Sequence, residues 1–344
     1  QGAVVLTNKN LIVEMKNLFE SFIKLIAIAI DKKSPYTGGH CERVPEIAML
    51  LAEAVENTTE GKYENFSMTK DERYELYIAS WLHDCGKVAT PTHIVDKATK
   101  LETITDRIET IDTRFEVLKR DFEITMLEKE LQLIKNGVSA DKVDKIKSEF
   151  KEAINKLFDD REFLRKINIG SEFMDPIDQK RVENIAKYKW RFDGLEVPFL
   201  DEFDVRNLQI SKGTLLPEER SIINEHIDIT IEMLEKLPYP KKLNKVPEFA
   251  GAHHEKLNGK GYPKGLTDEE MSIQAKIMAI ADIYEALTAK DRPYKDGYKL
   301  SEAMEIMSLM KNNSEIDKDL FEIFIKKGVY KEYADTYVDD NQID

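Results

Sequence analysis

The chain has 344 residues, of which 42% are hydrophobic and 9% aromatic, so general disorder is excluded and a folded protein with a sizeable core is expected. Its formal net charge of -14 argues against DNA or anionic lipid held by bulk electrostatics, so we expect no DNA partner and no direct membrane contact. Two cysteines without CxxC spacing, and the lack of an apolar run long enough to span a bilayer, predict a reduced compartment and a cytoplasmic location.

The first predicted element is an amphipathic helix over residues 9–33. Because residue 1 is Gln and not Met, we expect a fragment, with an upstream sensor or membrane anchor left open. Two interpretations of the helix stay open: it packs on its own domain, or it carries a signal and pairs with the same helix of a second copy. We expect a homodimer formed through this helix. Its apolar residues recur at spacings of four and three, as in a heptad stripe: Leu11, Met15, Leu18, Phe22, Leu25 and Ala29.

The rest of the chain is predicted to be helical. No convincing alternating pattern of strands appears, so the fold class is all-α. Amphipathic helices are expected at 42–57, 70–84, 217–237, 246–254, 270–290 and 300–312.

The stretch between residues 98 and 207 differs from its flanks. A long charged helix from about 103 to 136, a turn and a second helix to about 167 predict an antiparallel helical hairpin. The aromatic segment "KYKWRFDGLEVPFLDEF" that follows is expected to be an irregular cap, either a lid over a pocket or part of an interaction hairpin. The apolar residues expected to face each other are Phe115, Leu118, Phe122, Met126 and Leu131 in the first arm and Val143, Ile146, Phe150, Ile154 and Leu157 in the second.

Histidine and aspartate motifs suggest a metal site. In "WLHDCGK", His83 and Asp84 stand side by side, and one carboxylate can bridge two divalent ions roughly 3.5 to 4 Å apart. Imidazole and carboxylate without thiolate suit Fe, Mn, Ni or Zn. Asp282 lies in an apolar helical stretch, where a buried carboxylate needs a cation. Further histidines follow in "PYTGGHCERV" (His40), "ERSIINEH" (His226) and "HHEKLNGKGYP" (His253 and His254).

Taken together, these motifs resemble the HD-GYP family of HD metal-dependent phosphohydrolases. "HDCGK" fits HDxGK, "HHEKLNGKGYP" fits HHExxxGxGYP, and "ALTAKDRPYK" fits the downstream segment of the family. The resemblance implies an HD-domain helical bundle and a phosphodiesterase that opens cyclic di-GMP to pGpG, with further hydrolysis to GMP left open. The expected organisation is a linker helix at 1–33, a catalytic domain at 34–97 and 208–325, an inserted hairpin and cap at 98–207, and a tail at 326–344.

The family pattern also implies the roles of individual residues. By resemblance, His40, His83, Asp84 and Asp282 ligate one ion, and Asp84 bridges to a second ion that His226, His253 and His254 hold. The implied cofactors are two divalent metals, Fe or Mn in the first place and Ni or Zn as alternatives, with a bridging hydroxide as nucleophile. The implied catalytic residues are Asp84 and Lys87, and the implied substrate contacts are Lys87, Tyr262, Arg292 and Lys295.

Two features of the "HHEKLNGKGYP" motif lead to local expectations. Glu255 is expected to orient a ligand histidine and not to bind metal. Gly259 and Gly261 are expected to form a tight loop, stiffened by Pro263, from which Tyr262 projects toward substrate.

Alternatives to the leading interpretation remain. The substrate could be another cyclic dinucleotide such as cyclic GMP-AMP. The chain could instead be a slow sensor or scaffold that binds cyclic di-GMP. GGDEF-type cyclases are expected as protein partners.

Overall fold

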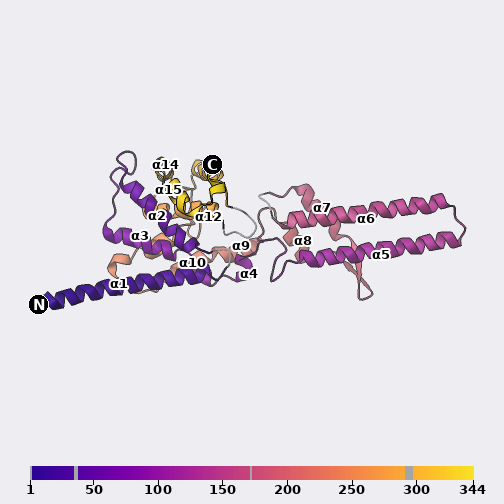
Figure 1. The fold of residues 1–344 in the computed structure, drawn as a ribbon, viewed down its shortest axis with the longest axis horizontal. Coiled ribbons are helices and arrows are strands. Elements are labelled where there is room, and N and C mark those ends of the chain that lie inside the picture. Colours follow the sequence, from indigo (N-terminus) through magenta and orange to yellow (C-terminus); the bar gives the residue numbers. More distant parts are fainter. Residues whose placement is uncertain (1, 35–37, 171–172, 291–296) are drawn as a thin grey trace. The chain divides into compact units, whose positions relative to one another are not determined.

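The structure is a computed structural model that describes residues 2–34, 38–170, 173–290 and 297–344. By its internal contacts the chain divides into two units, Gln1–Val95 with Ser221–Asp344, and Asp96–Arg220. Helices dominate both units (Figure 1), and the all-α prediction is confirmed, with one small two-stranded sheet among the described residues. Within those residues, no helix combines the length and the apolar character needed to cross a membrane.

The first unit is a bundle of helices contributed by both ends of the chain. Its centre is α12, which is buried along most of its length and packs against α2 and α11. The elements of this unit are α1 (Gly2–Asp31), α2 (His40–Glu56), α3 (Lys70–Leu82), η1 (Cys85–Val88), α4 (Thr92–Val95), α10 (His226–Glu235), η2 (Lys241–Leu243), α11 (Val246–Gly251), α12 (Ile273–Thr288), α13 (Leu300–Asn312), α14 (Lys318–Lys326), α15 (Val329–Tyr337) and η3 (Asp340–Gln342).

The start of α3 shows how local sequence sets an element. Thr69 and Glu72 form a capping box, in which each side chain accepts a hydrogen bond from the backbone amide of the other. Such a box satisfies two of the amide groups that a helix start leaves without a partner. The helix therefore begins at a fixed residue and delivers its C-terminal end, with His83 and Asp84, to the bundle interior.

Two helical predictions in the first unit need correction. The helix expected over 217–237 is two helices, α9 (Pro217–Asn224) and α10, separated at Glu225. Residues 326–344, expected to be a tail, contain α15, whose buried Tyr333 packs against Tyr284 of α12. Because tyrosine rings supply large apolar surfaces, this last helix belongs to the core of the unit.

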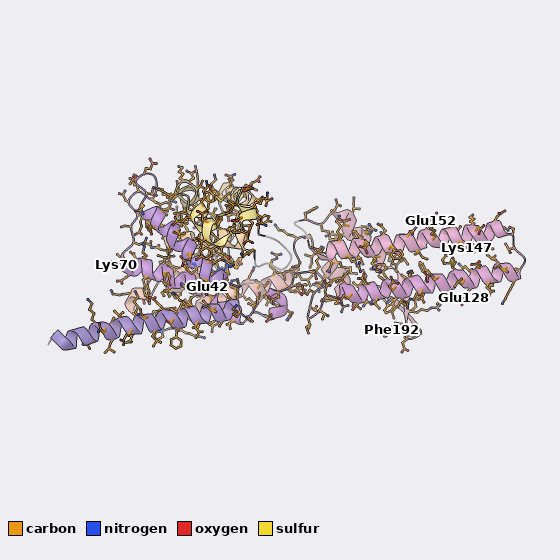
Figure 2. The ribbon with its side chains drawn as sticks, viewed as in Figure 1. Glu42, Lys70, Glu128, Lys147, Glu152 and Phe192 are labelled. Carbon is orange, nitrogen blue, oxygen red and sulfur yellow. The ribbon has the colours of Figure 1, made fainter. Side chains whose placement is uncertain are left out.

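The second unit has a core of its own. It contains α5 (Ile108–Lys135), α6 (Ala140–Asn168), α7 (Pro176–Ala186), β1 (Lys189–Phe192), β2 (Leu195–Pro198) and α8 (Glu202–Leu208). The predicted antiparallel hairpin is the pair α5 and α6, and charged side chains such as Glu128, Lys147 and Glu152 stand on its surface (Figure 2). Leu131, which was expected to face the second arm, is exposed.

The segment expected to be an irregular cap is a β-hairpin. β1 and β2 pair antiparallel, with Trp190 opposite Val197 and Phe192 opposite Leu195. The two turn residues, Asp193 and Gly194, both have positive φ, of 50° and 74°. An Asp-Gly pair favours this turn because its twist matches that of the paired strands. The signal was therefore present in the sequence as "FDGL".

In the second unit the buried side chain of Lys100 contacts the C-terminal end of α8. The Lys100 ammonium group donates hydrogen bonds to the carbonyl oxygens of Leu208 and Ile210, at and just beyond the end of α8. Burial lowers the pKa of Lys100 to about 8. Since the carbonyl groups at a helix C-terminus attract positive charge, we assign this lysine a structural role.

Candidate metal centre

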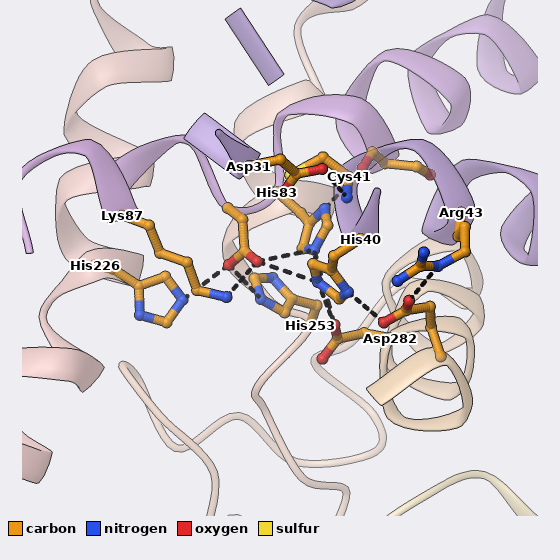
Figure 3. Close-up of polar contacts among 12 residues, drawn as sticks. Asp31, His40, Cys41, Arg43, His83, Lys87, His226, His253 and Asp282 are labelled. Atoms are coloured by element: carbon orange, nitrogen blue, oxygen red, sulfur yellow. Dashed lines mark hydrogen bonds and ion pairs between the residues drawn. The ribbon is translucent and has the colours of Figure 1, made fainter. Parts of the chain in front are cut away.

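The seven predicted ligands lie at the ends of helices or inside the central one. His40 is the first residue of α2, and His83 and Asp84 follow the last residue of α3. His226 begins α10, and His253 and His254 follow α11, while Asp282 lies in the middle of α12. The bundle brings these side chains, which are up to 242 residues apart in the chain, to one place, and Figure 3 labels His40, His83, His226, His253 and Asp282 among them.

The first group of ligand atoms surrounds one point. The Nε2 atom of His40 lies 3.1 Å from Nε2 of His83, 3.2 Å from Oδ2 of Asp84 and 3.3 Å from Oδ1 of Asp282. The Nε2 atom of His83 lies 3.4 Å from Oδ2 of Asp84. Neighbouring ligands of a six-coordinate ion with bonds of about 2.1 Å are about 3 Å apart, so these spacings suit a divalent cation.

A second group lies on the other side of Asp84. The ligand atoms of His226, His253 and His254 are all within 4.8 Å of one another. The Nε2 atom of His226 lies 3.1 Å from Oδ1 of Asp84, and that of His253 lies 3.9 Å from the same oxygen. Asp84 thus directs Oδ2 toward one histidine group and Oδ1 toward the other, as a bridging carboxylate must.

The imidazole rings are held in the orientation that metal binding requires. The Nδ1 atoms of His83, His226 and His253 each lie within 2.5 to 2.7 Å of the carbonyl oxygen three residues earlier. Since a carbonyl oxygen can only accept, Nδ1 carries the proton in these rings and Nε2 keeps its lone pair for a cation. A metal-binding histidine typically donates its other nitrogen in this way.

Charges around Asp84 favour its ionised form. The Lys87 ammonium group lies 2.5 Å from Oδ2 of Asp84. Burial acts to raise the pKa of Asp84, but the positive charge of Lys87 and hydrogen bonds with neighbouring histidines hold it well below its usual range. On the other side, burial lowers the pKa of His254 to about 4, and burial together with His254 lowers that of His253. The carboxylate and these two imidazoles are therefore in the forms that bind a cation.

Two residues join the HD motif to α10. The Thr230 hydroxyl accepts a hydrogen bond from the Gly86 amide at 2.9 Å and donates one to the His83 carbonyl oxygen at 3.2 Å. A Cβ atom at Gly86 would overlap the carbonyl oxygen of His226 and lie 2.7 Å from the Thr230 nitrogen. The glycine of this motif is needed because the backbones of η1 and α10 meet here.

The "HHEKLNGKGYP" loop is closed by Glu255, which corrects its expected role. Its two carboxylate oxygens accept hydrogen bonds from the amides of Lys264 and Leu266, at 2.7 and 2.9 Å, instead of holding a histidine. Gly259 has a φ of 73°, and a Cβ atom at Gly261 would overlap the backbone of Glu255. The closed loop places the Tyr262 ring 4.9 Å from the His254 ring.

Sequence reasoning missed the residues that support His40. Its Nδ1 atom makes a very short contact with Oε2 of Glu285, whose other oxygen accepts a hydrogen bond from Nε of Arg43 at 2.7 Å. Burial acts to lower the pKa of His40, yet the charge of Glu285 and the hydrogen bonds to Asp282 and Asp84 raise it well above its usual range. The available signal was the position of Glu285, three residues after Asp282 and on the same face of a helix.

The predicted site residues thus fall into two sets. The structure brings Lys87 and Tyr262 to the seven histidine and aspartate side chains. Arg292 and Lys295 lie outside the described residues.

Three buried atoms of the seven histidine and aspartate side chains indicate that the site suits a metal. Oδ1 of Asp84 and the Nε2 atoms of His226 and His253 have no hydrogen-bond partner within the part of the chain that is described. Leaving one such buried atom without a partner costs about 1–3 kcal/mol. A cation between them would satisfy all three atoms at once, so the residues fit the divalent metals that the sequence suggests.

Comparisons with known proteins find an HD domain and cyclic-dinucleotide phosphodiesterases among the similar proteins. Residues 204–320 match the family model described as HD domain. Over 193 residues the chain is 31% identical to a cyclic di-GMP phosphodiesterase of Thermotoga maritima, covering 51% of each protein. It is 40% identical over 83 residues to a 3'3'-cGAMP-specific phosphodiesterase of Vibrio cholerae, covering 24% of this chain and 19% of the relative. It is 42% identical over 79 residues to a cyclic di-GMP phosphodiesterase of Pseudomonas aeruginosa, covering 23% of this chain and 18% of the relative.

Fold, site and similarity define one class of protein. A helical bundle in which adjacent His and Asp residues meet further histidines from distant helices is an HD domain. Its "HDCGK" and "HHEKLNGKGYP" motifs resemble those of the HD-GYP family, and the matched HD domain agrees with that resemblance. It spans about half the length of the Thermotoga relative and less than a fifth of the other two.

Proposed function

We propose that this chain is a metal-dependent phosphodiesterase that opens cyclic di-GMP to the linear dinucleotide pGpG. The observation that carries the proposal is the position of Asp84, with one carboxylate oxygen facing His40 and His83 and the other facing His226. Two cations about 3.5–4 Å apart are the usual arrangement for an in-line displacement at phosphorus.

The proposed ligands form two sets, one for each of two ions. His40, His83, Asp84 and Asp282 are assigned to the first ion, and Asp84 with the three remaining histidines to the second. Fe or Mn is the proposed metal, with Ni or Zn as alternatives, since the donors are imidazole and carboxylate. Divalent cations held there would supply Lewis acidity toward the phosphate and an activated water nucleophile.

Other side chains are assigned to the substrate. Lys87 keeps a positive charge beside Asp84, where it would offset the charge that develops on a phosphate oxygen. The Tyr262 ring lies beside His254 and is available to contact a guanine base or a phosphate. Arg292 and Lys295 are proposed as phosphate contacts on the strength of the "RPYK" motif.

A second substrate has specific support. Several relatives from Vibrio cholerae carry the name 3'3'-cGAMP-specific phosphodiesterase. The proposal of a slow sensor or scaffold has less support, because all seven ligand positions carry the residue that the family pattern implies. GGDEF-type cyclases as partners and a cytoplasmic location stay predictions.

The experiment compares both cyclic dinucleotides on the same protein. Protein loaded with Mn²⁺ or Fe²⁺ under anaerobic conditions is incubated with cyclic di-GMP or with 3'3'-cGAMP, and the products are separated by chromatography. We expect pGpG from cyclic di-GMP, and a loss of at least about a hundredfold in Asp84→Ala. Asp228→Ala, which changes an exposed carboxylate of α10, should keep full activity.

Three results would contradict parts of the proposal. Faster turnover of 3'3'-cGAMP would change the assigned substrate. Tight binding of cyclic di-GMP without product would favour the sensor. Full activity of Asp84→Ala would remove the metal site from the mechanism.

A further inference from the structure

The helix α1 has two apolar faces, and one of them packs on its own unit. Ile23, Ala27 and Ile30 are buried in the main core. Along the same side, the Lys16 ammonium group lies 4.0 Å from the centre of the Tyr74 ring, and that of Lys24 lies 5.3 Å from the Trp81 ring. This face explains why the helix belongs to the first unit.

The second face is the predicted heptad stripe, and the structure leaves it exposed. Large apolar side chains follow one another at spacings of four and three, with more apolar residues beside them. The exposed fractions in the stripe are 50% for Leu11, 71% for Met15, 59% for Leu18, 56% for Phe22 and 61% for Leu25, and the flanking residues are Ile12 (67%) and Ile26 (44%).

The area of this stripe matches what one partner buries in a stable interface. Seven large apolar residues that are each about half exposed or more present on the order of 800 Å². A standard interface buries about 800 Å² on each partner. The largest apolar patch of an ordinary monomer is about 300–600 Å². The stripe is therefore large enough to support association by itself.

The spacing identifies the occupant as a second copy of the same helix. A repeat of four and three keeps one side of a helix facing a parallel partner helix, whose identical stripe interlocks with it. No charged residue interrupts the positions from Leu11 to Leu25 that form the seam. Two copies of α1 paired in this way would cover most of each other's stripe.

The C-terminal end of α1 holds the segment that carries His40. Asp31, its last residue, is buried, and its Oδ2 atom accepts hydrogen bonds from the backbone amides of Gly39 at 3.1 Å and Cys41 at 3.0 Å. These two amides flank His40 in the chain. Figure 3 shows Asp31 beside the histidine cluster.

Lys33, two residues after α1, contacts the backbone that follows Asp84. The Lys33 ammonium group donates hydrogen bonds to the carbonyl oxygens of Lys87, Val88 and Thr90, at 3.0, 2.6 and 2.6 Å. The segment from Lys87 to Thr90 begins three residues after Asp84. One pocket is lined by Asp31 and Lys33 together with His40, Asp84 and Lys87.

We propose that α1 pairs with α1 of a second copy of this chain, and that Asp31 and Lys33 couple this pairing to the metal centre as positioning residues. A shift of α1 along or about its axis moves the backbone on both sides of His40 and the loop after Asp84. Coupling of this kind is reciprocal, so pairing raises metal affinity by the same factor by which metal raises the affinity of pairing.

The first test measures association of the full chain by analytical ultracentrifugation. We expect a dimer at micromolar concentration, and a monomer for the double variant Leu18→Glu with Phe22→Glu. Asn17→Glu, which adds one negative charge at an exposed position outside the stripe, should remain a dimer. A monomeric parent chain, or a double variant that still dimerises, would overturn the pairing.

The second test measures Mn²⁺ affinity by calorimetric titration of the same proteins. We expect the monomeric double variant to bind Mn²⁺ about fivefold or more weakly. Asp31→Asn and Lys33→Met should weaken Mn²⁺ binding while the chain stays dimeric, with folding checked by circular dichroism. Unchanged Mn²⁺ affinity in all three would overturn the coupling. The inference rests on the proposed function only for its metal site. Neither the association state nor the Mn²⁺ affinity is measured with a cyclic dinucleotide, so both tests remain valid if the chain cleaves no phosphodiester.

Discussion

Glu285 shows how a single side chain can set the properties of a ligand that is distant in sequence. It is buried, and it lies between the His40 ring and the Arg43 guanidinium group. Burial acts to raise the pKa of Glu285, but the charges of His40 and Arg43 lower it to about 2. A permanently ionised carboxylate at this point fixes the His40 ring and raises its affinity for a cation.

Replacing Glu285 by glutamine should weaken the metal site while the fold is kept. The neutral amide cannot hold His40 and Arg43 as the carboxylate does, so we expect about a 10- to 100-fold loss of Mn²⁺ affinity by calorimetric titration. Glu42→Gln, on the exposed side of α2, is the matched control and should bind Mn²⁺ as the parent chain does. Equal affinities in the two variants would show that Glu285 does not support the site.

At this scale the sequence indicates which histidine and aspartate side chains gather at the site, but it does not indicate which residues support them. The seven ligand positions follow from motifs in which each residue has a fixed neighbour, as in "HDCGK". The contact between His40 and Glu285 joins residues 245 positions apart, and its only local signal is the spacing of three residues between Asp282 and Glu285. Glu255 was assigned to a histidine because it is adjacent to two of them, whereas the loop amides are its partners.

At the scale of elements, the junction between η1 and α10 determines where the two groups of ligands meet. Gly86 lies against the first turn of α10, and Thr230 bonds to the backbone on both sides of Asp84. This contact places His226 beside Asp84. Side-chain bulk at the junction must therefore affect both stability and metal binding.

A methyl group at Gly86 should separate these two elements. The added Cβ atom of Gly86→Ala would overlap the His226 backbone, and overpacking of this kind costs about 1–3 kcal/mol. We expect a lower unfolding midpoint in urea and a lower Mn²⁺ content after purification. For Gly38→Ala, no atom lies within 4 Å of the new Cβ atom, so this control should match the parent chain. A stable Gly86→Ala protein with full metal content would contradict the packing.

Elements with strong apolar periodicity were predicted well, and those that depend on turn chemistry were not. The helix expected at 300–312 is α13 (Leu300–Asn312), because its buried residues repeat with helical spacing. The β-hairpin was missed since each strand has only four residues and its faces do not alternate in burial. The exposed stripe of α1 was visible in the sequence, but the opposite packed face became apparent only in the structure.

The whole molecule consists of two units with separate cores, and the seven proposed metal ligands all belong to the first one. The second unit is held by its own apolar residues and by charged pairs such as Arg114 with Asp204. Binding of a metal can stabilise only the unit whose native state holds the ligands.

Scanning calorimetry should therefore resolve two unfolding transitions that respond differently to metal. At a free Mn²⁺ concentration 100 times its Kd, the first unit gains about 2.7 kcal/mol, which corresponds to a rise of about 5–10 °C in Tm. The transition of the second unit should not move, and EDTA should reverse the rise. Asp84→Ala is the control, with no shift on adding Mn²⁺. Equal shifts of both transitions would show that the units do not unfold separately.

The order of the ligands along the chain has a consequence for biosynthesis. His40, His83 and Asp84 precede residues 96–220, while the other four ligands follow them. As the polypeptide leaves the ribosome, the inserted unit can complete its core while the helices before it still lack α10, α11 and α12. Those early helices then expose apolar surface while more than 180 further residues are translated, and we expect them to be prone to aggregation during that interval.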